Sequence, residues 1–208
     1  MTLASCDSRK TAGENPFFTE WDTPHGVPPF DKILPEHFMP AFERGMSLHE
    51  AEIDAITSNK DEATFENTIL AYDNAGQMLA QTELVFGMLC AAETNDRMQA
   101  LQEQAMPLLA AHRDKIRLDD KLFVRVKEVY DRRAALGLDA EQMRLLQKTY
   151  DSFVRAGALL DAEQKARLKE INGQLSLTAV KFGNNILAEN NNFVLELKSD
   201  ELDGLPAG

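Results

Sequence analysis

From residue 38 to residue 186, apolar side chains recur every three or four positions, the spacing that aligns them on one face of an α-helix. A chain with this period buries one stripe of each helix against neighbouring helices, so the pattern restricts the fold to packed helices. The sequence therefore predicts an all-α, antiparallel multi-helix bundle. The last helical segment carries the seam expected where antiparallel helices meet, at Leu168, Ile171, Leu175, Thr178, Phe182 and Ile186.

Helices are expected from about residue 35, and the second of them contains two glycines. Thr64 is a natural N-cap for a helix that would continue to residue 92, because its hydroxyl can accept a hydrogen bond from a free amide of the first turn. Gly76 and Gly87 each weaken that continuity by about 1 kcal/mol relative to alanine. The segment is therefore expected to be one long helix unless a glycine interrupts it.

The pentapeptide Leu-Asp-Ala-Glu-Gln occurs twice, at residues 138–142 and 160–164. In each copy an aspartate, Asp139 or Asp161, precedes a glutamine by three positions, so the pair can satisfy free backbone amides reciprocally in a capping box. We predict that each aspartate is the N-cap of a helix.

Residues 15–34 are rich in proline and phenylalanine. Prolines lack an amide donor and push the preceding residue into an extended conformation, so this segment is predicted to be an extended arm and not a helix. Large aromatic side chains are poorly tolerated in water, and the arm is therefore expected to be pinned against another surface. The anchoring side chains would be Phe17, Phe18, Trp21 and Phe30.

Residues 193–198 alternate in polarity, with Phe193, Leu195 and Leu197 on one face, and asparagines at 190–192 separate them from the helix before. We predict one lone strand there. A lone strand leaves its backbone groups unpaired, so its partner is expected outside these 208 residues. Residues 15–192 are accordingly assigned to a helical domain, and 193–208 to the strand and the start of a further part of the protein.

Leu3, Ala4, Ser5 and Cys6 match the end of a bacterial lipoprotein signal, in which the cysteine is lipidated. The apolar segment that normally precedes such a site is missing, so a chance match is the alternative. We assign residues 1–14 to a signal remnant or disordered tether outside the fold, with Cys6 as the lipidation site. A membrane tether through Cys6 favours the cell envelope over the cytoplasm.

Acidic residues outnumber basic residues by 34 to 22, which gives a net charge of −12. That charge repels phosphate backbones, and nucleic acid is excluded as a partner.

The sequence contains no run of about 18 to 20 apolar residues, the length that a helix needs to span a bilayer. Cys90 stands in an apolar helical stretch and is interpreted as a core residue, so a disulfide framework is not expected.

Residues 49–52, His-Glu-Ala-Glu, begin like the zinc-binding motif His-Glu-x-x-His, but Ile53 occupies the position of the second histidine. One imidazole does not make that site, and His49 is interpreted as a histidine partly packed beside the core. No ligand spacing connects the remaining histidines, His25, His37 and His112. We therefore predict no catalytic residue, no metal ligand and no cofactor in this chain.

Several blocks, taken in order, carry a family resemblance. They are 15–18 (Asn-Pro-Phe-Phe), 21–31 (Trp-Asp-Thr-Pro-His-Gly-Val-Pro-Pro-Phe-Asp), 36–43 (Glu-His-Phe-Met-Pro-Ala-Phe-Glu), 64–69 (Thr-Phe-Glu-Asn-Thr-Ile), 109–112 (Leu-Ala-Ala-His), 150–158 (Tyr-Asp-Ser-Phe-Val-Arg-Ala-Gly-Ala) and 182–185 (Phe-Gly-Asn-Asn). Together they resemble the amino-terminal region of the M3, or thimet oligopeptidase, family of zinc metallopeptidases. The peptidyl-dipeptidase branch is favoured over the oligopeptidase A branch.

The resemblance implies an amino-terminal part of an all-helical clam-shell, which restricts substrate entry to short unfolded peptides. It also implies that the zinc ligands lie in the carboxyl-terminal part of a longer protein, which removes dipeptides from the carboxyl end of short peptides. This chain would then be inactive by itself, and its partners would be oligopeptide substrates and the catalytic domain. Surfaces that normally meet that domain could cause artificial self-association.

Two alternatives remain open. The parent could be an endo-acting peptidase like oligopeptidase A, or the chain could be a free-standing helical interaction protein without catalysis. A His-Glu-x-x-His motif encoded beyond Gly208 would favour a peptidase, whereas a natural stop codon there would favour the interaction protein.

Overall fold

The computed structural model describes residues 15–196, and within that range it contains helices and turns but no strand. The predicted all-α, multi-helix fold is confirmed. The elements are η1 (Pro16–Phe18), η2 (Pro24–Gly26), η3 (Pro35–His37), α1 (Phe38–Ser58), the π-helical η4 (Phe65–Leu70), α2 (Ala71–Asp73), α3 (Gln77–Ala92), α4 (Asp96–Arg117), α5 (Asp120–Asp131), η5 (Arg133–Ala135), α6 (Ala140–Arg155) and α7 (Ala162–Asn192).

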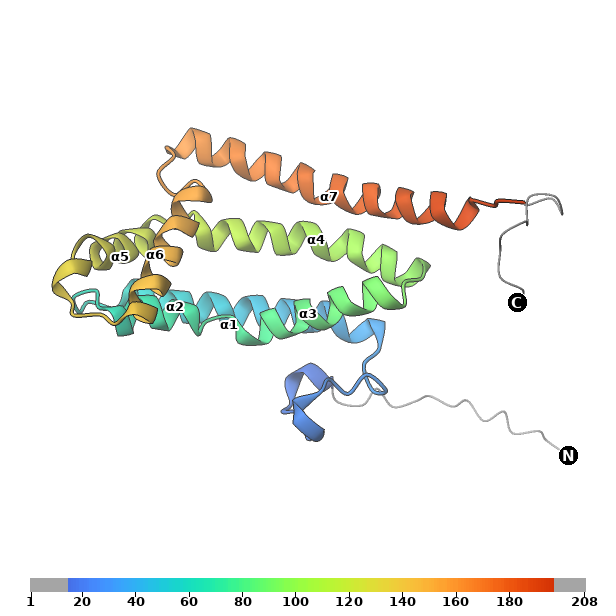
Figure 1. The fold of residues 1–208 in the computed structure, drawn as a ribbon, viewed down its shortest axis with the longest axis horizontal. Helices are drawn as coiled ribbons and strands as arrows, with labels where there is room; N and C mark the ends of the chain where they lie inside the picture. Colours follow the sequence, from blue (N-terminus) through green and yellow to red (C-terminus); the bar gives the residue numbers. More distant parts are fainter. Residues whose placement is uncertain (1–14, 197–208) are drawn as a thin grey trace, which may run out of the picture.

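The long helices lie side by side and alternate in direction (Figure 1). Helix α1 packs against α3 on one side and α4 on the other, and α4 in turn packs against α7. Helices α5 and α6 close one end of this row, while the arm lies near the opposite end, below α1 and α3 in the view of Figure 1. The antiparallel arrangement follows from the short connections between consecutive helices.

Two apolar clusters form the core of the described chain, one toward each end of the row. One joins the arm to the start of α1 and to α3 and α4, and its largest fully buried side chains are Phe38, Phe42 and Phe86. The other joins the end of α1 to η4, α5 and α6, and contains Leu122, Leu146 and Phe153. Fully burying one such side chain is worth about 1.5–3 kcal/mol.

The arm differs from the prediction in two respects. It is not uniformly extended, because it contains two short 3₁₀ turns and a third follows it at Pro35–His37, each beginning with a proline whose fixed φ suits a first helical position. The expected anchoring is confirmed for Phe17, which is buried, and for Phe18 and Trp21, which pack against the same cluster. It is wrong for Phe30, whose side chain remains 40% exposed.

The second helical segment is interrupted at Gly76, whereas Gly87 lies inside α3. Gly76 has φ +75°, a left-handed conformation that glycine adopts without a steric penalty. Its backbone N–H donates to Oε2 of Glu52 at 2.7 Å, so the start of α3 is fixed to α1. The break therefore reflects a close approach of two helices.

The predicted helix caps are confirmed. The hydroxyl oxygen of Thr64 accepts a hydrogen bond from the backbone N–H of Asn67 at 3.1 Å. Asp139 and Asp161 each form the expected capping box, with Gln142 and Gln164 respectively. These contacts span only three residues, which is why the local sequence predicts them.

Helix α7 packs on α4 with a face that was not predicted. Asn172 donates from Nδ2 to Oδ1 of Asp114 at 2.8 Å, and the buried Lys165 forms an ion pair with Asp120. Most of the apolar row predicted to form a helix-packing seam is instead exposed, including Ile171, Leu175, Phe182 and Ile186. The contact of Asn172 with α4 and that of Lys165 with α5 hold α7 in a rotation that leaves this row exposed.

No strand forms over the described part of 193–198. Residues 193–196 follow α7 without regular structure, and Phe193 and Val194 are 74% and 75% exposed. No second strand is present in residues 15–196, so these backbone groups lack a ladder partner there. Residues 197–208 lie outside the described range, as does the predicted tether at 1–14. Among the described helices, none is long and apolar enough to cross a membrane.

Candidate functional site

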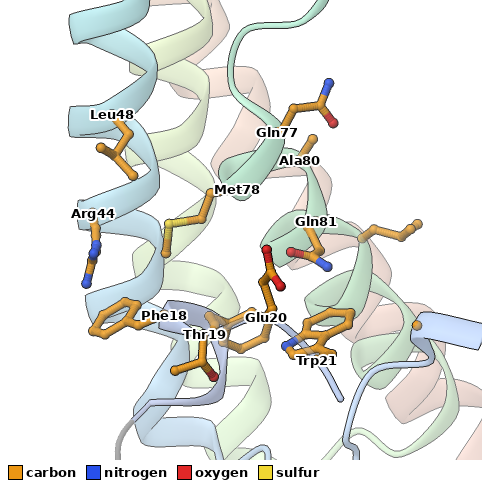
Figure 2. Close-up of a pocket in the computed structure, with 13 residues that line it drawn as sticks. Phe18, Thr19, Glu20, Trp21, Arg44, Leu48, Gln77, Met78, Ala80 and Gln81 are labelled. Carbon is orange, nitrogen blue, oxygen red and sulfur yellow. The ribbon is translucent and has the colours of Figure 1, made fainter. Parts of the chain in front are cut away.

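A groove of about 820 Å³, termed here the arm groove, lies between the arm, α1 and α3 (Figure 2). Phe18 and Trp21 line it from the arm. Helix α1 contributes Arg44 and Leu48, and helix α3 contributes Gln77 and Gln81. Its volume lies within the range of about 300–1,000 Å³ that is typical of small-ligand pockets.

Hydrogen bonds and ring packing hold the arm wall of this groove in place. Asn15 accepts the backbone N–H of Phe17 at 3.1 Å through Oδ1 and donates from Nδ2 to the carbonyl oxygen of His37 at 2.8 Å. Trp21 donates from Nε1 to the carbonyl oxygen of Pro16 at 2.9 Å. The ring centroid of Phe17 lies 5.3 Å from that of Phe38 at the start of α1. The wall is thus built from residues separated by more than 20 positions.

The arm groove combines aromatic surface with polar groups that can bind a ligand. The guanidinium of Arg44 lies over the ring of Phe18, 4.5 Å from its centroid, which is a cation–π contact. Figure 2 shows this pair on the α1 side, and Glu20 on the side nearer α3. Within residues 15–196, the side chains of Arg44, Gln77 and Gln81 form no hydrogen bond or ion pair with another residue. The other described residues therefore leave their donors and acceptors open to a ligand.

A pair of histidines joins α1 to α4 midway between the two apolar clusters. Nε2 of His112 lies 3.1 Å from Nδ1 of His49, so one ring donates a hydrogen bond to the other. On its other side, Nδ1 of His112 lies 3.5 Å from Oε1 of Glu50, and that carboxylate forms an ion pair with Lys115 at 2.8 Å. The two histidines also line a cavity of about 200 Å³, and Glu83 of α3 lines it as well.

Burial sets the charge of this pair. Burial lowers the pKa of His112, and the attraction of Glu50 opposes that effect. The pKa of His49 is lowered by burial and by repulsion from His112. The contact with Lys115 holds the pKa of Glu50 below its usual range. At neutral pH the cluster therefore contains two neutral imidazoles and an ionised carboxylate, a set suited to holding two helices together.

The structure confirms that His49 packs partly beside the core, but sequence reasoning missed its partner. His49 and His112 are 63 positions apart, and linear spacing could not relate them. The available signal was that each histidine interrupts the apolar stripe of its own helix. The other two histidines lie in the arm region, where Nδ1 of His37 accepts the backbone N–H of Leu34 and His25 occupies η2 with φ 59°.

The remaining predicted site residues give little chemistry. Cys6 lies outside the described residues. Cys90 is half-buried, and burial raises the pKa of its thiol, which disfavours the reactive thiolate. Within residues 15–196, no three histidine, cysteine, aspartate or glutamate side chains are grouped so that they could hold a metal ion. The described residues do not fit a zinc site.

Comparison with known proteins identified relatives among peptidases. No family model matches the chain. It is 41% identical over 176 residues to a dipeptidyl carboxypeptidase of Escherichia coli and 38% identical over 174 residues to that of Salmonella typhimurium. An oligopeptidase A of Escherichia coli is 24% identical over 185 residues. The first two matches cover 85% and 84% of this chain but 26% of each relative, so the chain spans about a quarter of their length.

The fold and the groove define a helical module with a ligand-sized hollow and, in its described part, no cluster of metal ligands. The resemblance to the M3 peptidases is confirmed by these matches. The chain is homologous to part of the dipeptidyl carboxypeptidases of this family.

Proposed function

We propose that this chain is the substrate-restricting helical part of an M3 zinc peptidase and contributes no catalytic residue. The observation that carries the proposal is the 41% identity to a quarter of the Escherichia coli dipeptidyl carboxypeptidase. The whole protein would release dipeptides from the carboxyl end of short peptides, with its zinc held by residues outside this chain. The role of the helices would be to limit which peptides reach those residues.

The exposed face of α7 supports a partner in the form of the catalytic part of the same protein. Leu175, Phe182 and Ile186 are 62%, 66% and 45% exposed on one side of a helix whose other side is packed on α4. Contiguous apolar surface of this kind is typical of an interface. Docking of the catalytic part on this face would bury the row that α4 leaves open.

An endo-acting parent is the second candidate, because oligopeptidase A of Escherichia coli also matches most of this chain. The lower identity of 24%, against 41%, makes it the less favoured of the two. Analysis of cleavage products separates the candidates, since one releases dipeptides only and the other cuts internal bonds.

Mass spectrometry of the native protein tests the further proposal that Cys6 is lipidated and tethers the protein in the cell envelope.

An assay of the isolated chain with short peptides tests its non-catalytic role. We expect no hydrolysis above background, with or without added zinc, and no effect of a chelator. Hydrolysis that a chelator abolishes would contradict the proposal. Stable folding, measured by circular dichroism on the same preparation, ensures that a negative result reflects missing chemistry.

A further inference from the structure

The spacing of polar groups along the arm groove matches an extended polypeptide. Gln77 and Gln81 are four positions apart on α3, which separates them by about 6 Å along the helix axis. Alternate residues of an extended chain are about 6.6–6.8 Å apart. Each glutamine side chain offers both a donor and an acceptor, so the two amides can pair with the backbone of every second residue of a bound peptide.

Apolar and aromatic surface surrounds these amides. Leu48 of α1 and Leu84 of α3 line the groove and are 45% and 66% exposed, while Phe18 and Trp21 line the wall formed by the arm. In an extended peptide, side chains alternate between two faces, so those that do not face solvent would contact this surface. The lining therefore selects peptides with apolar side chains.

Charge gives the groove a direction. Among the described residues, Arg44 is the only lysine or arginine that lines it, in a protein whose net charge of −12 otherwise repels anions. Its guanidinium is already oriented by the ring of Phe18, which reduces the entropy lost when it binds a carboxylate. Glu20 lies nearer α3 and can face the amino end of the same peptide (Figure 2). A terminal carboxylate at Arg44 would pair with the cation that the described residues contribute to the groove.

The geometry points to the arm groove as a binding site for short extended peptides with apolar side chains, held by their terminal carboxylate at Arg44 and by their backbone at Gln77 and Gln81. The choice of a peptide as occupant rests on the proposed peptidase function, whereas the direction and the residues rest on the groove itself. Because peptide binding is measured without hydrolysis, its result is independent of the hydrolysis assay.

Trp21 is the only tryptophan of the chain, so its fluorescence reports on the groove directly. The 208-residue chain is titrated with a tetrapeptide of alanine and leucine that has a free carboxylate, and with the same peptide as a carboxyl-terminal amide. We expect a saturable change for the free acid and about tenfold weaker binding of the amide, as for the loss of a charge-assisted hydrogen bond. No saturable change, or equal affinity for the two peptides, would overturn the inference.

Three variants locate the binding. Arg44→Gln should weaken binding of the free-acid peptide about tenfold and remove the preference for it over the amide. Replacing both Gln77 and Gln81 by alanine should weaken the binding of the two peptides equally, because only contacts with the peptide backbone are lost. The matched control is Arg167→Gln, which removes an exposed arginine of α7 that is paired with Glu170. If Arg167→Gln weakens binding as much as Arg44→Gln does, the carboxylate is not bound at Arg44 and the inference fails.

Discussion

His49 and His112 show how single residues position the helices of this protein. Their hydrogen bond joins α1 to α4, and Nδ1 of His49 would lie 2.9 Å from a Cβ atom placed on Gly76. Glu52, one turn from His49, receives the backbone N–H of Gly76. Two side chains of α1 thus fix both α4 and the start of α3.

The stability of the folded chain should fall as the pH is lowered. The pKa values of His49 and His112 are lowered by burial, so their protonation favours the unfolded state, in which a histidine titrates near pH 6.5. Their stabilising contribution is complete above that pH and is lost as the pH falls through their folded pKa values. We expect a smaller free energy of unfolding at pH 5.5 than at pH 7.5, measured by urea denaturation.

Carboxylates with shifted pKa values also titrate in acid, so a variant must isolate the histidine effect. Replacing His49 and His112 by glutamine should abolish most of the difference between pH 7.5 and pH 5.5. His25→Asn removes an exposed histidine elsewhere and should preserve the difference in stability between the two pH values. An unchanged pH dependence in the double variant would mean that other groups control it.

Two glycine substitutions should have opposite effects on stability. Gly76→Ala forces a side chain into a left-handed conformation and against His49, and should lower the free energy of unfolding by about 1–2 kcal/mol or more. At Gly87, inside α3, a new Cβ would meet open space. Gly87→Ala should therefore raise the free energy of unfolding by up to about 1 kcal/mol. Thermal and urea denaturation of both variants would check this contrast, and equal effects would contradict it.

At the scale of elements, helix starts could be predicted and helix faces could not. The caps at Thr64, Asp139 and Asp161 depend on contacts within three residues, which the sequence contains in full. The rotation of α7 depends on contacts made across 58 positions by Asn172 and across 45 positions by Lys165. The spacing of apolar residues shows which side chains share one face of a helix. It does not show which neighbouring element packs on that face.

The same limit applies to the arm groove and to the histidine pair. Aromatic residues of the arm were expected to anchor it, but periodicity could not show that Arg44 and the glutamines of α3 would face the same hollow. The histidine contact joins two helices that are not consecutive in the chain. Both sites require knowledge of which helices become neighbours.

Removing either repeated cap should destabilise the chain to a similar extent. Asp139→Ala and Asp161→Ala each leave a first-turn amide without its side-chain acceptor, and each should lower the free energy of unfolding by about 1 kcal/mol. Lys169→Ala, at an exposed position of α7, serves as the control and should change it by less than about 0.5 kcal/mol. Urea denaturation gives the three values, and a cap variant as stable as the control would argue against this role.

At the scale of the whole molecule, the outward face of α7 should govern self-association of the isolated chain. Replacing Leu175, Phe182 and Ile186 by serine removes exposed apolar surface while leaving the polar contacts with α4 intact. We expect a smaller fraction of dimer or larger species in sedimentation velocity, with little change in helicity. Val124→Ser, at a 54% exposed position of α5, should leave association unchanged. Equal association of the triple variant and the original chain would show that this face is not an interface.

In the proposed function, these helices serve a peptidase whose catalytic residues lie elsewhere in the polypeptide. The most direct test replaces the matching quarter of the Escherichia coli dipeptidyl carboxypeptidase by this chain and measures the products released from short peptides. We expect the chimera to release dipeptides in a chelator-sensitive reaction, and the same enzyme without that quarter to lose activity or selectivity for short peptides. A soluble, folded chimera that releases no dipeptides would contradict the proposed function.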